Sequence, residues 1–111
     1  MVAIYEHTSS YSSAEAALEV FLGIQELVLT NADDELGVYR AQIGDAWVVV
    51  TLGLDLPRPL RRRLSRICRG GQPFELPENL RQALWERHVQ GRVRGPYWES
   101  HYGPDGGIRL E

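Results

Sequence analysis

The chain has 111 residues, of which 43% are hydrophobic and 24% are charged, and its formal net charge is −3. This composition is typical of a globular domain and excludes a disordered chain, and the length suits one domain, residues 1–111, with one hydrophobic core. No apolar run approaches the roughly 18 residues that a membrane span needs, so we expect no membrane partner.

The single cysteine cannot form an internal disulfide, which fits a reducing compartment. The first residues, MVAIYEHTSS, lack the basic segment and apolar core of a secretory signal, so we predict a cytoplasmic protein. All 12 basic residues are arginine, which is typical of GC-rich coding and indicates a bacterial or phage origin.

The first predicted elements are a strand and a long helix. Residues 2–8 are rich in β-branched and aromatic side chains, which favours a strand. Ser12 followed by Glu15 forms a capping box, so we expect a helix from there to about Leu29. Helical spacing predicts that its buried side contains Ala14, Ala17, Leu18, Phe21, Leu22, Gln25, Val28 and Leu29, and its outer side Glu15, Glu19 and Glu26.

Residues 36–54 predict a β-hairpin, because two alternating strands flank the turn dipeptide Gly44-Asp45. The register then follows by arithmetic. One face is wholly apolar and needs a cover of helices; its pairs are Ile43 with Ala46, Ala41 with Val48, Tyr39 with Val50, and Gly37 with Leu52. The other face is mixed and is expected to be solvated or to bind a partner; its pairs are Gln42 with Trp47, Arg40 with Val49, and Val38 with Thr51.

Two further helices and a last strand are expected after the hairpin. Pro57 and Pro59 favour a helix start, and the apolar stripe of that helix is Leu60, Leu64, Ile67 and Cys68. The next helix covers about 77–89, with Leu80, Ala83, Leu84 and His88 on its inner side. Residues 92–102 resemble a strand broken by Gly95-Pro96, after which Ile108 and Arg109 can pair back.

The element order is therefore β-α-β-β-α(α)-β, which predicts the α+β class. The expected architecture is an antiparallel sheet with helices on one face, either ferredoxin-like or a related curled α+β sheet.

The charge is distributed unevenly along the chain. Residues 1–55 contain nine acids and one arginine, a net −8, whereas residues 56–111 contain eleven arginines and six acids, a net +5, which together give −3. The stretch 58–69 alone has six arginines, of which Arg58, Arg62, Arg66 and Arg69 share the side opposite the apolar stripe. We expect them to be solvated or paired with acids, with anion or nucleic-acid binding as an alternative.

Aromatic and arginine side chains are the residues that anchor protein interfaces. Trp47 and Arg40 lie on the mixed hairpin face, where they could form a cation–π pair, and Trp98 and Tyr102 share one face of the last predicted strand. We therefore predict an interface at Trp47, Arg40, Trp98 and Tyr102.

A pocket between sheet and helices would need titratable groups, and the candidates are Tyr97, His101, His7 and Asp45. The three histidines show no ligand spacing, so we predict no metal site, and no motif indicates a cofactor or a catalytic residue. Cys68 lies on an apolar stripe at a helix C-terminus, which favours a buried, unreactive thiol.

The favoured hypothesis is a small non-catalytic binding or regulatory protein that acts through a protein–protein interface, with a second copy or another protein as partner, and forms a homodimer. One alternative is an anion or nucleic-acid binder that uses the arginine-rich helix 58–69. A second alternative is an enzymatic or small-molecule pocket between sheet and helices, which we rank last because its candidate residues are dispersed.

Overall fold

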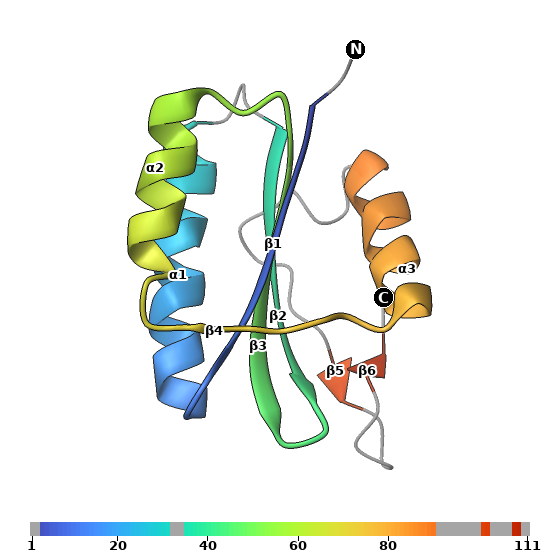
Figure 1. The fold of residues 1–111 in the computed structure, drawn as a ribbon. Helices are drawn as coiled ribbons and strands as arrows, with labels where there is room; N and C mark the ends of the chain where they lie inside the picture. The colour runs from blue at the N-terminus through green and yellow to red at the C-terminus, as the bar shows by residue number, and fades with distance from the viewer. Residues whose placement is uncertain (1–2, 32–34, 91–100, 103–107, 110–111) are drawn as a thin grey trace.

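In a computed structural model of the chain, the structure describes residues 3–31, 35–90, 101–102 and 108–109. Both helices and strands are present along this part of the chain (Figure 1). The elements are β1 (Ile4–Tyr11), α1 (Ala14–Thr30), β2 (Glu35–Ile43), β3 (Ala46–Leu54), α2 (Arg58–Ile67), β4 (Gln72–Pro73), α3 (Glu78–Val89), β5 (His101–Tyr102) and β6 (Ile108–Arg109).

The main sheet has four strands in the order β2-β3-β1-β4, and each neighbouring pair is antiparallel. β3 therefore lies between β1 and β2, which α1 connects, so this part is a split β-α-β unit. The predicted α+β class is confirmed. The fold departs from a regular ferredoxin-like arrangement in its fourth strand, which is only two residues long, and in its third helix.

The β2–β3 hairpin has the predicted register at every position, from Gly37 opposite Leu52 to Ile43 opposite Ala46. Gly44 has φ +60, the left-handed conformation that a tight two-residue turn requires and that glycine adopts without strain. The predicted return pairing at the C-terminal end is also confirmed, because Tyr102 of β5 lies opposite Ile108 of β6. The rest of the predicted strand over 92–102 lies outside the described residues, apart from His101 and Tyr102.

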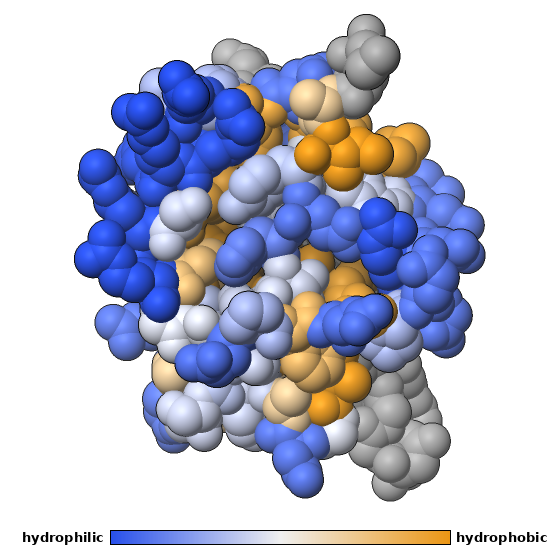
Figure 2. All heavy atoms as spheres, viewed as in Figure 1, coloured by the Kyte–Doolittle hydropathy of each residue, from blue (hydrophilic) through white to orange (hydrophobic). Residues whose placement is uncertain are grey.

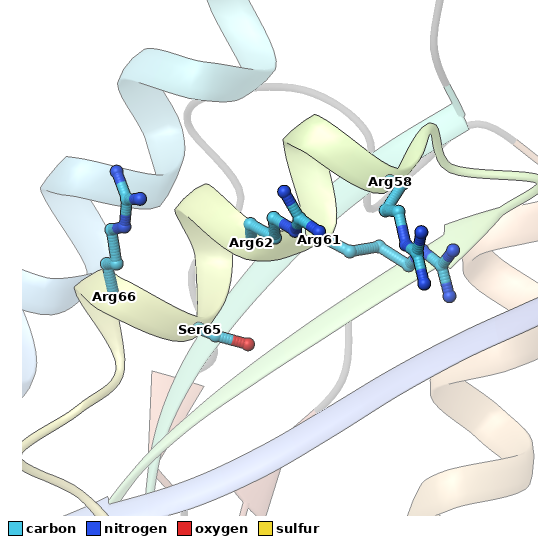
Figure 3. A pocket seen from close by; sticks show the side chains of 5 residues that line it. All are labelled: Arg58, Arg61, Arg62, Ser65 and Arg66. Carbon is cyan, nitrogen blue, oxygen red and sulfur yellow. The ribbon is translucent and has the colours of Figure 1, made fainter.

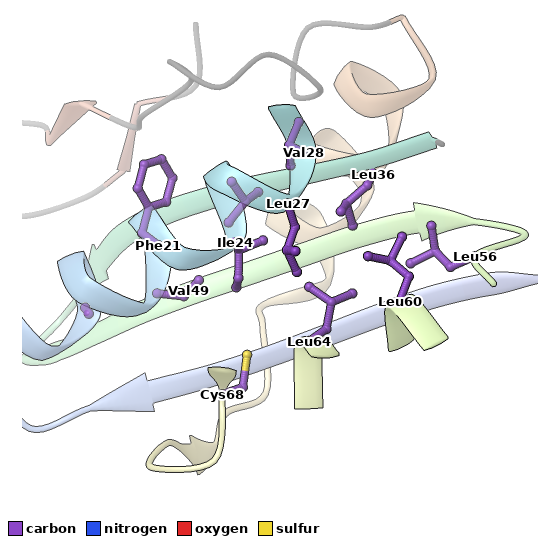
Figure 4. Packing of buried hydrophobic residues seen from close by; sticks show 12 residues of the cluster. Phe21, Ile24, Leu27, Val28, Leu36, Val49, Leu56, Leu60, Leu64 and Cys68 are labelled. Atoms are coloured by element: carbon purple, nitrogen blue, oxygen red, sulfur yellow. The ribbon is translucent and has the colours of Figure 1, made fainter. Parts of the chain in front are cut away.

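The mixed face of the hairpin is covered by α1 and α2, so the expectation that it is solvated is wrong, while partner binding at its half-buried Arg40 and Trp47 stays a prediction. Val38, Val49 and Thr51 of this face are at most 1% exposed. Figure 4 shows the two helices packing their apolar side chains against it. The cluster consists of Ala17, Phe21, Ile24, Leu27, Val28, Leu36, Val38, Val49, Leu56, Leu60, Leu64 and Cys68.

The wholly apolar face is buried as predicted, but its cover is α3, which lies on the opposite side of the sheet from α1 and α2 (Figure 1). The expectation of helices on one face alone therefore needs correction. The physical reason is that α1 and α2 already fill the face of Val49, and the side chains of Tyr39, Val48 and Val50 need a separate cover. Leu76 and Leu84 are the buried residues that supply it, assisted by Phe74, Leu80 and Trp85.

The helix α1 differs from its sequence pattern in two respects. Its N-cap is Ser13, whose side chain accepts a hydrogen bond of 3.1 Å from the backbone N–H of Ala16, so Ser12 is not the cap. Its inner side includes Ile24 and Leu27, while three residues predicted to be buried are exposed: Leu18 (37%), Leu22 (49%) and Leu29 (58%). Packing against α2 explains part of the rotation of α1 about its own axis. Gly23 of α1 faces Ile67 of α2 where the two helices meet, and this side of α1 is therefore turned toward α2.

Candidate functional site

Helix α2 presents a row of arginines outward from the sheet. Pro57 occupies the N-cap and Pro59 the first turn, so the helix begins where the sequence predicted. Leu60 and Leu64 bury the inner side, which leaves the arginines exposed. Figure 2 shows the strongly hydrophilic surface that results over α2.

A hollow of about 450 Å³ lies among these side chains, and we call it the arginine hollow (Figure 3). Its lining consists of Arg58, Arg61, Arg62, Ser65 and Arg66. Three of the four arginines predicted for anion binding are therefore brought together, and Arg69, although exposed, does not line the hollow. Sequence reasoning had not assigned Arg61 and Ser65 to an anion site, although their positions three and seven residues after Arg58 place them on the same side of the helix.

No carboxylate neutralises the arginine hollow within the part of the chain that the structure describes. Arg81 forms ion pairs with Glu6 and with Glu78, and none of these three residues belongs to α2. The four arginines of the hollow make none. The alternative of pairing with the neighbouring α1 is therefore not realised, and these side chains face solvent.

The neighbouring helix α1 carries the opposite charge on its outer side. Glu15, Glu19 and Glu26 are all exposed, and they form no ion pair among the described residues. The exposed leucines of α1 lie beside this acidic row. The two helices contact each other on the same face of the sheet, so one layer presents an acidic and a basic helix side by side (Figure 1).

The inner side of α2 meets a polar stripe of β1. The hydroxyls of Tyr11 and Ser9 are hydrogen-bonded at 2.8 Å. Burial raises the pKa of Tyr5 to about 12, that of Tyr11 to about 12, and also that of the Cys68 thiol. Cys68 is buried as predicted, and its thiol stays protonated at neutral pH, which makes it a poor nucleophile.

The predicted interface residues are only partly described. Trp47 is half-buried against the cluster under α1 and α2. Arg40 is half-buried, and its guanidinium carbon lies 5.6 Å from the centroid of the Phe21 ring, so the cation–π contact involves Phe21. Trp98 lies outside the described residues, and Tyr102 is placed only by its pairing in β5. Their role in an interface stays a prediction.

The predicted pocket residues do not converge where the structure describes them. His7 lies in the middle of β1 opposite Thr51, and burial lowers its pKa. Asp45 is exposed in the hairpin turn, six residues before Thr51, a separation of roughly 20 Å along a strand. His101 is placed in β5, and Tyr97 lies outside the described residues. Over the described ranges, no three His, Cys, Asp or Glu side chains are arranged to hold a metal.

A second hollow, of about 370 Å³, lies on the α3 side of the sheet and differs in its electrostatics. Arg81 lies in this hollow, and its Nε–H donates to both carboxylate oxygens of Glu6 at 2.8 and 2.9 Å. Arg81 and Glu6 thereby supply each other's counter-charge, and this hollow has side chains of both charges, whereas the arginine hollow has positive ones alone. The arginine hollow is therefore the stronger candidate for recognising a charged partner.

Comparison with protein-family models, with curated proteins and with solved structures gives no significant match to this chain. Among the described residues, no helix has the length and apolar character needed to cross a bilayer.

Proposed function

We propose that the protein is a small non-catalytic binding protein whose working form is a homodimer joined through the α1–α2 layer. The observation that carries the proposal is the pair of unneutralised faces, acidic on α1 and basic on α2, next to each other on one surface. Neither face finds its counter-charge within the described chain. A second copy offers both.

A two-fold axis parallel to the helices and between two facing layers superimposes α1 of each copy on α2 of the other. The same contact is then made twice, as in isologous dimers generally. Each contact would bring Glu15, Glu19 and Glu26 of one copy to the arginine hollow of the other. Face-to-face stacking of two identical layers thus converts a local charge imbalance into a complementary interface.

Both apolar and ionic contacts contribute to this interface. An exposed ion pair contributes only about 0–1 kcal/mol, so no single pair holds the dimer. Three glutamates facing four arginines at each of the two contacts form a network that contributes more. The exposed Leu18 and Leu22 add apolar area beside the acidic row. We expect an interface of moderate affinity that weakens with salt.

Charge reversal offers a sharp test. Variant A carries Glu19→Arg and Glu26→Arg, which makes both helices basic. Variant B carries Arg58→Glu, Arg62→Glu and Arg66→Glu, which makes both helices acidic, because only Arg61 and Arg63 of α2 then remain positive. Each variant alone is expected to sediment as a monomer, because like charges then meet in the stacked layers. An equimolar mixture of A and B is expected to form a dimer, since each copy again meets an opposite charge.

A matched control places the same kind of charge change on the other face of the sheet. Glu86→Arg on α3 is exposed and lies outside the proposed interface, so it should leave the dimer unchanged. The proposal is wrong if wild type is a monomer at every concentration tested, or if A and B remain dimers when studied separately. A mixture of A and B that stays monomeric would also refute it.

A further inference from the structure

We propose that the arginine hollow binds a small ligand with two or three linked phosphates, and that this ligand competes with the second copy for the same arginines. The competition rests on the homodimer proposed above, whereas the phosphate site does not. The ligand would then act as a regulator that converts the dimer into a ligand-bound monomer.

The lining of the arginine hollow determines the ligand's chemistry. Arg58, Arg61, Arg62 and Arg66 bring four positive charges to about 450 Å³, and Ser65 adds a hydroxyl. Guanidinium groups are planar forks that match phosphate and carboxylate oxygens in bidentate fashion. Linked phosphates supply several negative charges within so small a volume. A single carboxylate would leave most of the charge without a partner.

The volume and the surroundings favour a small ligand over a nucleic acid. The hollow falls within the roughly 300–1,000 Å³ of small-molecule sites. It spans little more than two turns of one helix, so its arginines can contact only a short stretch of a phosphate backbone. The adjoining helix α1 is acidic, and residues 1–55 have a net charge of −8, so a long polyanion lying across the layer would meet repulsion.

The competition follows from shared arginines. The stacked dimer uses the α2 arginines to bind the partner copy's carboxylates, and a phosphate ligand uses them in its own binding. A ligand that binds only the monomer shifts the equilibrium toward the monomer by mass action. Two binding events that exclude each other must weaken each other by the same factor.

The experiment uses inorganic triphosphate as the ligand. Its dissociation constant is measured by calorimetry for wild type, for Glu19→Gln/Glu26→Gln, and for Arg61→Gln/Arg62→Gln. We expect the glutamine variant of α1 to be a monomer that binds triphosphate more tightly than wild type, because its arginines are not occupied. The variant of α2 should bind at least about tenfold more weakly, since two charge-assisted contacts are lost.

Sedimentation of wild type with triphosphate, against sodium chloride of equal ionic strength, tests the competition separately. A dimer dissociation constant that rises about tenfold more with triphosphate than with salt supports it. Equal effects refute the competition, while unchanged binding in Arg61→Gln/Arg62→Gln refutes the site itself. If wild type is a monomer at every concentration but still binds triphosphate, the proposed homodimer is refuted and the proposed phosphate site in the arginine hollow is retained. A 20-base-pair DNA duplex that binds more tightly than triphosphate overturns the choice of a small ligand.

Discussion

Replacing Leu84 by alanine tests whether α3 really covers the second face of the sheet. The side chain of Leu84 is fully buried among residues that include Tyr39, Val48 and Val50. The substitution removes three carbon groups, a transfer loss of roughly 2.4 kcal/mol at about 0.8 kcal/mol per group. The cavity left behind adds to this, so the free energy of unfolding should fall by about 3 kcal/mol. That is a large part of the 5–15 kcal/mol typical of a domain.

The measurement is urea unfolding at fixed protein concentration, followed by circular dichroism and by tryptophan fluorescence. Val89→Ala is the matched control, because Val89 belongs to the same helix but is 65% exposed. It should change the free energy of unfolding by less than about 0.5 kcal/mol. If Leu84→Ala is as mild as Val89→Ala, α3 does not pack on the sheet and the assignment of this face is refuted.

Two further predictions concern β1 and β3. Burial raises the pKa of Tyr5 and of Tyr11 to about 12 from an ordinary 10.0, so both hydroxyls ionise more easily in the unfolded chain. The contribution of these two tyrosines to stability should therefore be complete below pH 10 and decline as the pH rises toward 12. Ultraviolet titration should show Tyr5 and Tyr11 ionising late, and titration of both near 10 contradicts their burial. A Cβ on Gly53 would lie 2.6 Å from Leu56 Cδ1, so Gly53→Ala should destabilise by about 1–3 kcal/mol. Gly70→Ala, with nothing within 4 Å of the added Cβ, should be nearly neutral, and equal effects of the two would refute the crowding at Gly53.

The pairing of the β2–β3 hairpin was predictable residue by residue, because it depends only on neighbouring residues in the sequence. Side chains alternate with a period of two, and Gly44 allows the turn, so one turn position determines every pair from Gly37 to Ile43. The start of α2 was also predictable, since Pro57 and Pro59 end the preceding strand and are tolerated in the first turn of a helix. Burial of Cys68 followed from its place on the apolar stripe.

What the sequence did not determine was the assignment of helices to faces. An amphipathic stripe shows that a helix has an inner side, but not which sheet face it meets, and both hairpin faces contained enough apolar residues to accept a helix. In α1, apolar residues occupy more than half of the circumference. The pattern alone could not tell Ile24, which is buried, from Leu22, which is 49% exposed.

The sequence predicted which arginines share one side of α2, but not whether acidic side chains pair with them. The spacing of Arg58, Arg62 and Arg66 indicated a shared side, which the structure shows. Whether those charges find acids depends on the three-dimensional placement of α1, whose exposed glutamates form no ion pair with the arginines. Pairing between neighbouring helices is a tertiary property, and helical spacing within each carries no information about it.

The consecutive valines of β3 have a consequence for how the chain tolerates change. Val49 belongs to the cluster beneath α1 and α2, whereas Val48 and Val50 belong to the cluster beneath α3. Replacing a buried side chain of a helix changes the packing of one cluster, whereas a shift of the β3 backbone changes the packing of both clusters at once. We therefore expect the helices to tolerate more substitutions than β3. An insertion or deletion within Ala46–Leu54 should not be tolerated, because a shift of one residue turns each following side chain of the strand to the opposite face of the sheet and so into the other cluster.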